Sequence, residues 1–163
     1  MLHPDIRSVI WQEGAASSAP TRNMPYPPYE VLLERKREVA KIPETVLTAW
    51  DNHVGPVIFT TVDQNNIPNS IYATCVARYG DERFVVADNY FDKTRANIQT
   101  GSKGSFLFIT DEDKPYQIKG YIEYHPSGPI FDDMKQWNPE KHPGHAAAAI
   151  VVDEIYSGAE KIL

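Results

Sequence analysis

Short stretches of alternating apolar and polar residues, separated by turn residues, run along the chain from residue 57 to residue 156. Such alternation, together with enrichment in β-branched residues, is typical of strands with one buried face. The first two stretches are separated by Gln64-Asn65-Asn66 and have the local features of a hairpin. The pattern predicts strands over residues 57–63, 67–78, 84–87, 105–110, 116–125 and 145–156.

Short helical patterns lie between these strands. Helix starts are predicted at Pro43-Glu44, near Asp92, and at Ser127-Gly128-Pro129, because proline and acidic residues favour the first turn. Six closely spaced strands with two or three short helices favour a closed antiparallel barrel over alternating strand–helix units.

The first 43 residues differ in composition from the rest of the chain. They hold six of the thirteen prolines and the linker-like sequence AASSAP. One helix is predicted within them, from Tyr29 to Lys41, and we interpret its charged run ERKRE as a solvent-exposed face. We therefore divide the chain into an N-terminal extension, residues 1–43, and a barrel domain, residues 44–163.

The stretch FVVADNYFDKTRANI, residues 84–98, is the strongest candidate for a binding site. It predicts a buried strand, a polar turn and a short helix whose first turn carries Lys93 and Thr94. A helix start presents backbone N–H groups and partial positive charge, and an added ammonium and hydroxyl suit a phosphate. Asp88 and Asp92 flank this position and would repel a phosphate unless turned away; as the helix N-cap, Asp92 would accept from backbone donors instead.

Composition narrows the classes of function. A net charge of −6 argues against nucleic-acid binding, which usually needs a basic face. The single cysteine, Cys75, excludes a disulfide framework within the chain and a cysteine-based zinc cluster. The sequence shows no apolar run of membrane-spanning length and no signal-peptide pattern, so we expect a cytoplasmic protein that acts without a membrane partner.

Several segments match one known family in order and spacing: GPVIFTTVDQNNIPNSIYA, DKTRANI, SFLFIT, YQIKG and the final VV-rich strand. Through them, residues 44–163 resemble the FMN-binding split-barrel proteins, the pyridoxamine 5′-phosphate-oxidase-like superfamily. The resemblance implies a mainly β fold with short helices, a six-stranded antiparallel split β-barrel with Greek-key connections. It also implies a homodimer that binds FMN at the interface of its two subunits.

Carried over by position, the resemblance implies that Lys93 and Thr94 hold the FMN phosphate. The flavin ring would be lined by two strand segments and by one residue reaching it from the partner subunit, namely Tyr72, Ala73, Thr74 and Cys75, then Val86, Ala87, Asp88 and Asn89, and finally Gln117.

The C-terminal segment departs from the family pattern. It lacks the Trp-, Arg- and His-bearing signature with which the true pyridoxamine-phosphate oxidases hold their substrate, and ends instead in AAAAIVVDEIYSGAEKIL. The resemblance therefore implies an FMN-dependent oxidoreductase or flavin electron carrier of unidentified substrate, without an identifiable catalytic side chain. Two alternatives stay open: a non-catalytic flavin- or haem-binding or sensing module, and a barrel that binds a deazaflavin.

Two further features have both a functional and a structural interpretation. We interpret Cys75 as a small buried hydrophobe rather than a redox thiol. His142 and His145 have a spacing that suggests a metal or haem site, but Pro143-Gly144 breaks any helix that would place both on one face. Because no third ligand lies nearby in the sequence, we interpret this segment as a surface loop and predict no metal site.

Overall fold

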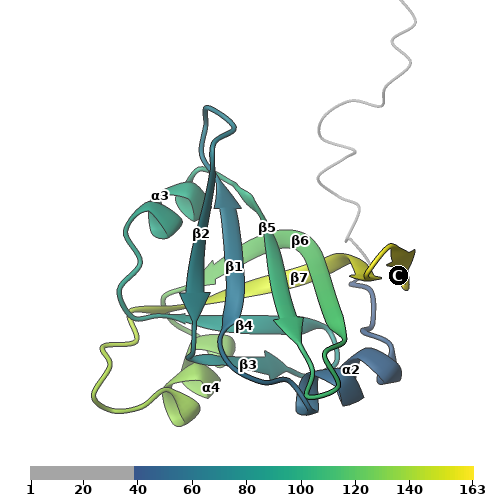
Figure 1. Ribbon diagram of the computed structural model, residues 1–163. Helices are drawn as coiled ribbons and strands as arrows, with labels where there is room; N and C mark the ends of the chain where they lie inside the picture. The colour runs from purple at the N-terminus through teal and green to yellow at the C-terminus, as the bar shows by residue number, and fades with distance from the viewer. Residues whose placement is uncertain (1–38) are drawn as a thin grey trace, which may run out of the picture. The chain divides into compact units, whose positions relative to one another are not determined.

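The computed structural model describes residues 39–163, which form one barrel-like domain (Figure 1). Ten positions of the helix predicted from Tyr29 to Lys41 lie outside the described residues, and the last three, 39–41, are not helical. The predicted division at residue 43 stays a prediction, although Ile42 already packs in the core with 3% of its surface exposed. The N–H of Ile42 donates to the carbonyl of Asp81 at 2.7 Å, which fixes the chain where it enters the domain.

The described chain contains three helices and eight strands, all strand pairs being antiparallel. The helices are α2 (Glu44–Asp51), α3 (Lys93–Gln99) and α4 (Pro129–Trp137). The strands are β1 (Val57–Val62), β2 (Pro68–Ala73), β3 (Val76–Tyr79), β4 (Arg83–Asp88), β5 (Lys103–Ile109), β6 (Pro115–His125), β7 (Ala146–Ser157) and β8 (Glu160–Lys161).

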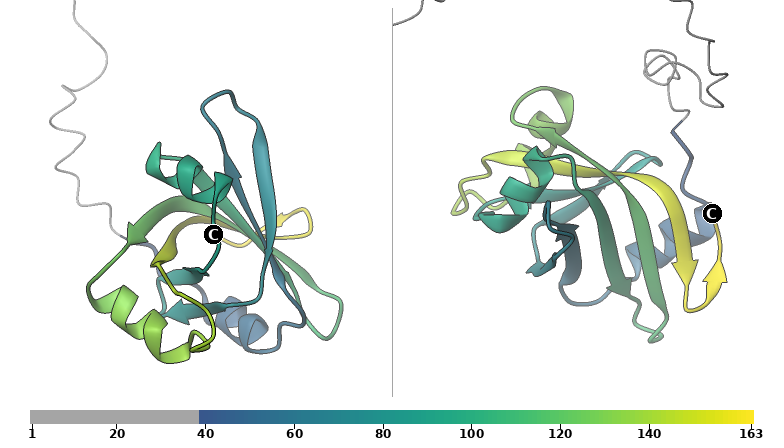
Figure 2. Two further views of the ribbon diagram at one scale, coloured as in Figure 1. Left: turned by 90° about the vertical axis from the view of Figure 1, so that its left-hand side faces the viewer. Right: turned by 90° about the horizontal axis from the view of Figure 1, so that it is seen from above.

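The strands are hydrogen-bonded in the order β2-β1-β5-β6-β7-β4-β3, with β8 paired to β7. The sheet curls strongly, as the two turned views show (Figure 2), but its end strands β2 and β3 are not hydrogen-bonded to each other. The split barrel implied by the family resemblance is thus confirmed, and the closed barrel expected from the strand pattern alone is wrong in this respect. Eight strands are present where six were predicted.

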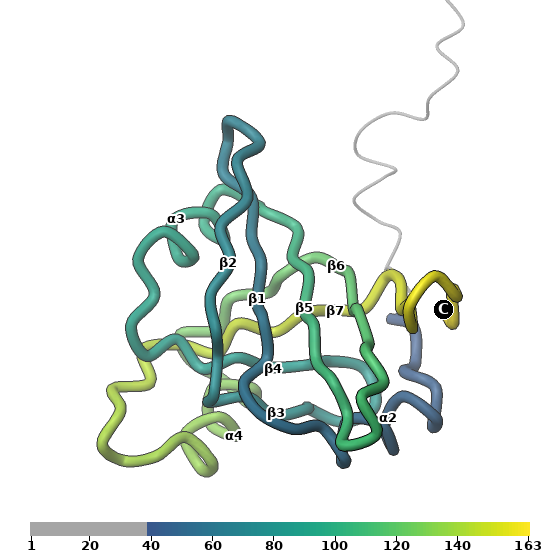
Figure 3. Tube along the Cα trace, viewed as in Figure 1, coloured from purple at the N-terminus to yellow at the C-terminus, as the bar shows by residue number. Residues whose placement is uncertain are grey.

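One predicted strand, residues 67–78, is divided in the structure. It forms β2 and β3, which are separated by Thr74 and Cys75. β2 pairs with β1, whereas β3 pairs with β4 on the far side of the sheet path. The chain leaves one end of the curled sheet at Thr74 and joins the other end at Val76, as the trace in Figure 3 shows.

Curvature of the sheet depends on a bulge in the long central pair. The register between β6 and β7 shifts between Lys119 and Gly120. A Cβ at Gly120 would lie 1.9 Å from the carbonyl oxygen of Val151, so only glycine allows the two backbones to approach so closely.

The barrel interior is filled by apolar side chains that alternate inward along the strands. Trp50 of α2 covers one end and packs edge-on against Phe84 and Phe108, with ring centroids 4.9 and 5.3 Å apart. A second apolar cluster lies on the outside, where Ile130 and Met134 of α4 cover the small residues of β7. The small side chains of Ala147 and Ala149, both fully buried, face α4 and let it pack closely against the sheet.

Candidate functional site

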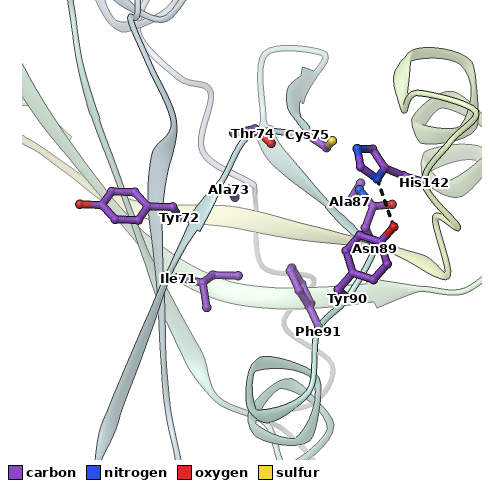
Figure 4. Close-up of a pocket in the computed structure, with 10 residues that line it drawn as sticks. All are labelled: Ile71, Tyr72, Ala73, Thr74, Cys75, Ala87, Asn89, Tyr90, Phe91 and His142. Carbon is purple, nitrogen blue, oxygen red and sulfur yellow. Dashed lines mark hydrogen bonds between the residues drawn. The ribbon is translucent and has the colours of Figure 1, made fainter.

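A groove opens where the two ends of the sheet path meet. One pocket of about 260 Å³ lies beside the Thr74-Cys75 connection (Figure 4). A second pocket of about 170 Å³ lies beside the start of α3. The two pockets share Ile71, Tyr90 and Phe91, so we treat them as one groove with a sheet end and a helix end. Their combined size falls within the roughly 300–1,000 Å³ typical of small-molecule sites.

The sheet end of the groove is mostly apolar. Ala73 and Ala87 contribute short side chains from β2 and β4, and Phe91 and Ile71 add apolar surface. The ring of Tyr72, which is 76% exposed, points away from the groove in Figure 4, so only the rest of this residue borders it. No carboxylate side chain lines this end among the described residues. A flat ring of neutral or negative charge suits such a slot.

Lys93 and Thr94 line the helix end. Lys93 is exposed, and among residues 39–163 its ammonium makes no ion pair or hydrogen bond. Thr94 is 2% exposed, and its hydroxyl accepts a hydrogen bond from the side-chain amide of Asn69 at 3.0 Å. The ammonium is therefore available to an anion, while the hydroxyl keeps its hydrogen for a second bond.

The two acidic residues that flank Lys93 differ in their environment. Asp92 precedes α3 as its N-cap residue, but its carboxylate makes no capping hydrogen bond, so the capping role suggested by the sequence is not present. Asp92 lines the helix end of the groove and is exposed. Asp88 is fully buried and points away from the groove, into a hydrogen-bond network beneath it.

Four hydrogen bonds hold the carboxylate of Asp88. Arg95 donates from Nε at 2.6 Å and from Nη2 at 2.8 Å, the hydroxyl of Tyr124 donates at 2.6 Å, and the N–H of Phe91 donates at 2.9 Å. Burial by itself would raise the pKa of the Asp88 carboxyl, but the hydrogen bonds from Arg95, Tyr124 and Phe91 outweigh burial and lower it. The negative charge of Asp88 is thus compensated by Arg95, and the pair links β4 to α3. Because of this pairing, we no longer expect Asp88 to repel a phosphate at the start of α3.

A loop from a distant part of the chain forms one wall of the sheet end. Asn138, at the end of α4, exchanges two side-chain hydrogen bonds of 3.0 Å with Asn89, and both residues are buried. Asn89 also accepts a hydrogen bond from the N–H of Gly144 at 3.0 Å. These bonds hold the loop 138–145 against the turn after β4 and place His142 in the groove wall.

The structure brings most of the predicted site residues to the groove. Those that line it are Tyr72, Ala73, Thr74, Cys75, Ala87, Asn89, Lys93 and Thr94. Three do not line it: the Val86 side chain is buried in the barrel core, Asp88 faces Arg95, and Gln117 lies on the outward side of β6. Contact of any of these residues with a cofactor stays a prediction.

Sequence reasoning missed five residues that line the groove: Ile71, Tyr90, Phe91, Asn69 and His142. The first three stand beside predicted site residues and could have been found by extending the two predicted segments. The surface-loop interpretation of KHPGH holds for His145, which is exposed, but His142 is half-buried in the groove wall. Cys75 is likewise half-buried and lines the groove.

Residues 39–163 contain neither a cluster of metal ligands nor a helix suited to a membrane. No group of three or more His, Cys, Asp and Glu side chains in this part of the chain could hold a metal ion. No helix in the same residues has the length and apolar character needed to cross a membrane.

Fold and groove together define a split-barrel protein with a candidate small-molecule groove where the two ends of the sheet path meet. A family model described as pyridoxamine 5′-phosphate oxidase matches residues 46–157. The chain belongs to this family, which confirms the resemblance found in the sequence. An uncharacterized protein of Methanocaldococcus jannaschii is 29% identical over 125 residues, covering 73% of this chain and 82% of that protein.

Solved structures share the fold at lower identity. HupZ of Group A Streptococcus has a TM-score of 0.63 and 23% identity, covering 74% of this chain and 96% of that one. An FMN-binding protein from Syntrophomonas wolfei has a TM-score of 0.57 and 23% identity, covering 80% of this chain and 93% of that one. At this level of identity the likeness concerns the fold.

Proposed function

We propose that this protein binds FMN in the groove and serves as an oxidoreductase or electron carrier, working as a homodimer in the cytoplasm. Family membership and the FMN-binding relative of the same fold support flavin binding. The observation that carries the proposal is the groove itself, which joins an ammonium without a partner among residues 39–163 at one end to a mostly apolar pocket at the other.

The residues present fit FMN. Its phosphate is a dianion, and Lys93 with the hydroxyl of Thr94 supplies a charge-assisted and a neutral donor at the helix end. The burial and ion pairing of Asp88 remove the nearest buried negative charge from this end, leaving the exposed Asp92 as the acid beside Lys93. At the sheet end, the small side chains of Ala73 and Ala87 leave room for a planar ring.

A bound FMN would supply the redox chemistry. The chain's own residues would bind the phosphate, orient the ring and limit access of water to it. None of these side chains needs to act as an acid or base.

The outer face of the sheet supports a homodimer. Phe59, Phe106 and Ile118 point into the barrel, so their neighbours along β1, β5 and β6 point outward. The register places four of these outward residues side by side across four strands, in the order Tyr72, Ile58, Leu107 and Gln117. Tyr72 belongs both to this outer face and to the groove, so a second copy packed here would lie next to the groove.

An acidic substitution on this face tests the dimer. We expect the wild-type protein to be a dimer by light scattering and Leu107→Glu to be a monomer with weaker FMN binding, because a buried charge without a partner opposes association. Ile67→Glu is the matched control: it places the same charge on a 60% exposed isoleucine between β1 and β2 and is expected to leave the dimer intact. A flavin-loaded monomer of the wild type would contradict the shared site.

Identification of the bound cofactor tests the function itself. We expect mass spectrometry of the extract from purified protein to show FMN, and FMN to slow maleimide labelling of Cys75, the chain's single thiol, because Cys75 lines the groove. If the mass is that of a deazaflavin, the cofactor is a deazaflavin and not FMN. If the protein shows a haem absorption band that is lost in His142→Ala, the haem-binding alternative is favoured. Labelling of Cys75 unaffected by FMN would place any bound flavin elsewhere.

A further inference from the structure

Tyr90 and His142 form a contacting pair on the wall of the groove. The hydroxyl of Tyr90 lies 3.3 Å from Nδ1 of His142, and the two rings meet edge to face with centroids 5.8 Å apart. Figure 4 shows the pair at the edge of the sheet end, with the imidazole reaching from its loop toward Cys75 and Tyr90. The family resemblance assigns neither residue to the phosphate or to the flavin ring.

The position of His142 is built into the fold. The buried pair of Asn89 and Asn138 and the hydrogen bond from Gly144 hold the two sides of its loop. The ammonium of Lys135 donates to the carbonyl of Pro143 at 3.0 Å, and the N–H of His142 donates to the carbonyl of Pro139 at 2.9 Å. These five hydrogen bonds fix the backbone of the loop on both sides of His142.

One nitrogen of His142 remains available. When the hydroxyl of Tyr90 donates to Nδ1, the hydrogen of a neutral imidazole stands on Nε2. Within residues 39–163, Nε2 has no hydrogen-bond partner. The side-chain amide of Asn89, the other nitrogen donor at this end, already donates to Oδ1 of Asn138, so His142 offers the more available N–H.

Tyr90 leaves most of its side chain exposed beside the groove. Its side chain is 70% exposed although it lies between the two pockets, and it lines both. A flat ligand that packs against this ring would remove its exposed apolar surface from water, and this burial would favour binding.

We propose that Tyr90 and His142 form the wall that recognises the ring of the bound flavin. Nε2 of His142 makes a hydrogen bond to an acceptor atom on the ring's edge, and Tyr90 packs against the ring while holding the imidazole in the donating tautomer. The inference rests on the proposed FMN site but concerns the ring alone, whereas Lys93 acts on the phosphate.

Binding of FMN and of riboflavin, which lacks the phosphate, separates these two contributions. We expect His142→Leu to weaken both ligands by the same factor, about five- to tenfold, the effect of losing one hydrogen bond in a partly buried site. His142→Gln, which keeps an N–H donor, should recover most of the loss, and Tyr90→Phe should show a smaller loss for both ligands. Flavin fluorescence quenching gives the affinities, and imidazole ¹⁵N shifts should move on riboflavin binding in the wild type.

His145→Leu is the matched control, because His145 stands on the same loop with an exposed side chain and no side-chain hydrogen bond among the described residues. It should bind both flavins as the wild type does. Equal affinities of His142→Leu and wild type, with the flavin still protecting Cys75, would overturn the inference and leave the FMN proposal standing. A wild-type protein that binds neither flavin would overturn both.

Discussion

Replacing Lys93 by alanine is expected to weaken FMN binding at least tenfold while leaving riboflavin binding unchanged. The ammonium has no partner of its own among the described residues. Its removal should therefore change the free energy of unfolding little but weaken the binding of FMN strongly. A charge-assisted hydrogen bond to a phosphate contributes about 1.5–3 kcal/mol, and 1.4 kcal/mol already corresponds to about tenfold in affinity. The two dissociation constants can be measured by fluorescence titration at low ionic strength.

Lys141→Ala provides the control for a general effect of charge, since Lys141 is also an exposed lysine but lies outside both pockets. We expect it to bind FMN as tightly as the wild type. If Lys93→Ala retains full affinity for FMN, or loses riboflavin to the same extent, the phosphate does not lie at the start of α3.

Replacing Asp88 by alanine is expected to lower the free energy of unfolding by about 3 kcal/mol, because removing one partner of a buried ion pair costs roughly 3–5 kcal/mol. The value should fall at the low end, since Arg95 is 34% exposed and can turn toward water. Tyr124→Phe removes a single donor to Asp88 and should cost about 1 kcal/mol. Asp132→Ala, on the exposed side of α4, should cost less than about 1 kcal/mol. Denaturant unfolding followed by tryptophan fluorescence measures all three.

Stability should also depend on pH through Asp88. Its pKa is lowered in the folded state, so below the ordinary value the unfolded chain binds a proton that the folded protein does not. The contribution of Asp88 is therefore fully present above about pH 4–5 and is lost as the pH falls through the lowered pKa. The difference in stability between wild type and Asp88→Ala should shrink across this acidic range. A difference that is constant down to pH 2 would show that the Asp88 carboxyl does not supply the stabilisation.

Much of the fold could be predicted from local patterns. The strands from Phe84 onward and the helix start at Pro43-Glu44 appear close to their predicted places, because each combines a clear periodicity with turn or proline signals at its ends. The division of residues 67–78 into β2 and β3 could not be predicted in this way. Its apolar alternation continues through Thr74 and Cys75, and the break exists only because β3 pairs with β4 instead of β1.

The candidate site shows the same limit. The segments around Ala73, Ala87 and Lys93 could be predicted because the family pattern places them by order and spacing, and they do line one groove. The orientation of Asp88 could not be predicted, because the local sequence allows its carboxylate to face either a phosphate or Arg95. The curl of the sheet decides between them, since it places Tyr124 of β6 where its hydroxyl donates to Asp88. His142 lies more than fifty residues from Asn89 along the chain, and nothing local to KHPGH indicates where its loop docks.

The amino-acid sequence by itself therefore determined the class of fold, the segments that border the groove and the lysine at its end. Periodicity and turn chemistry mark most of the strands, and the family pattern, through the order and spacing of its segments, implies the split barrel and the position of the site. Only the tertiary structure decided which side chains face the groove and which sit beneath it. Those choices depend on contacts between residues far apart in the chain, such as Asp88 with Tyr124 and Asn89 with Asn138, whose energies no local pattern contains.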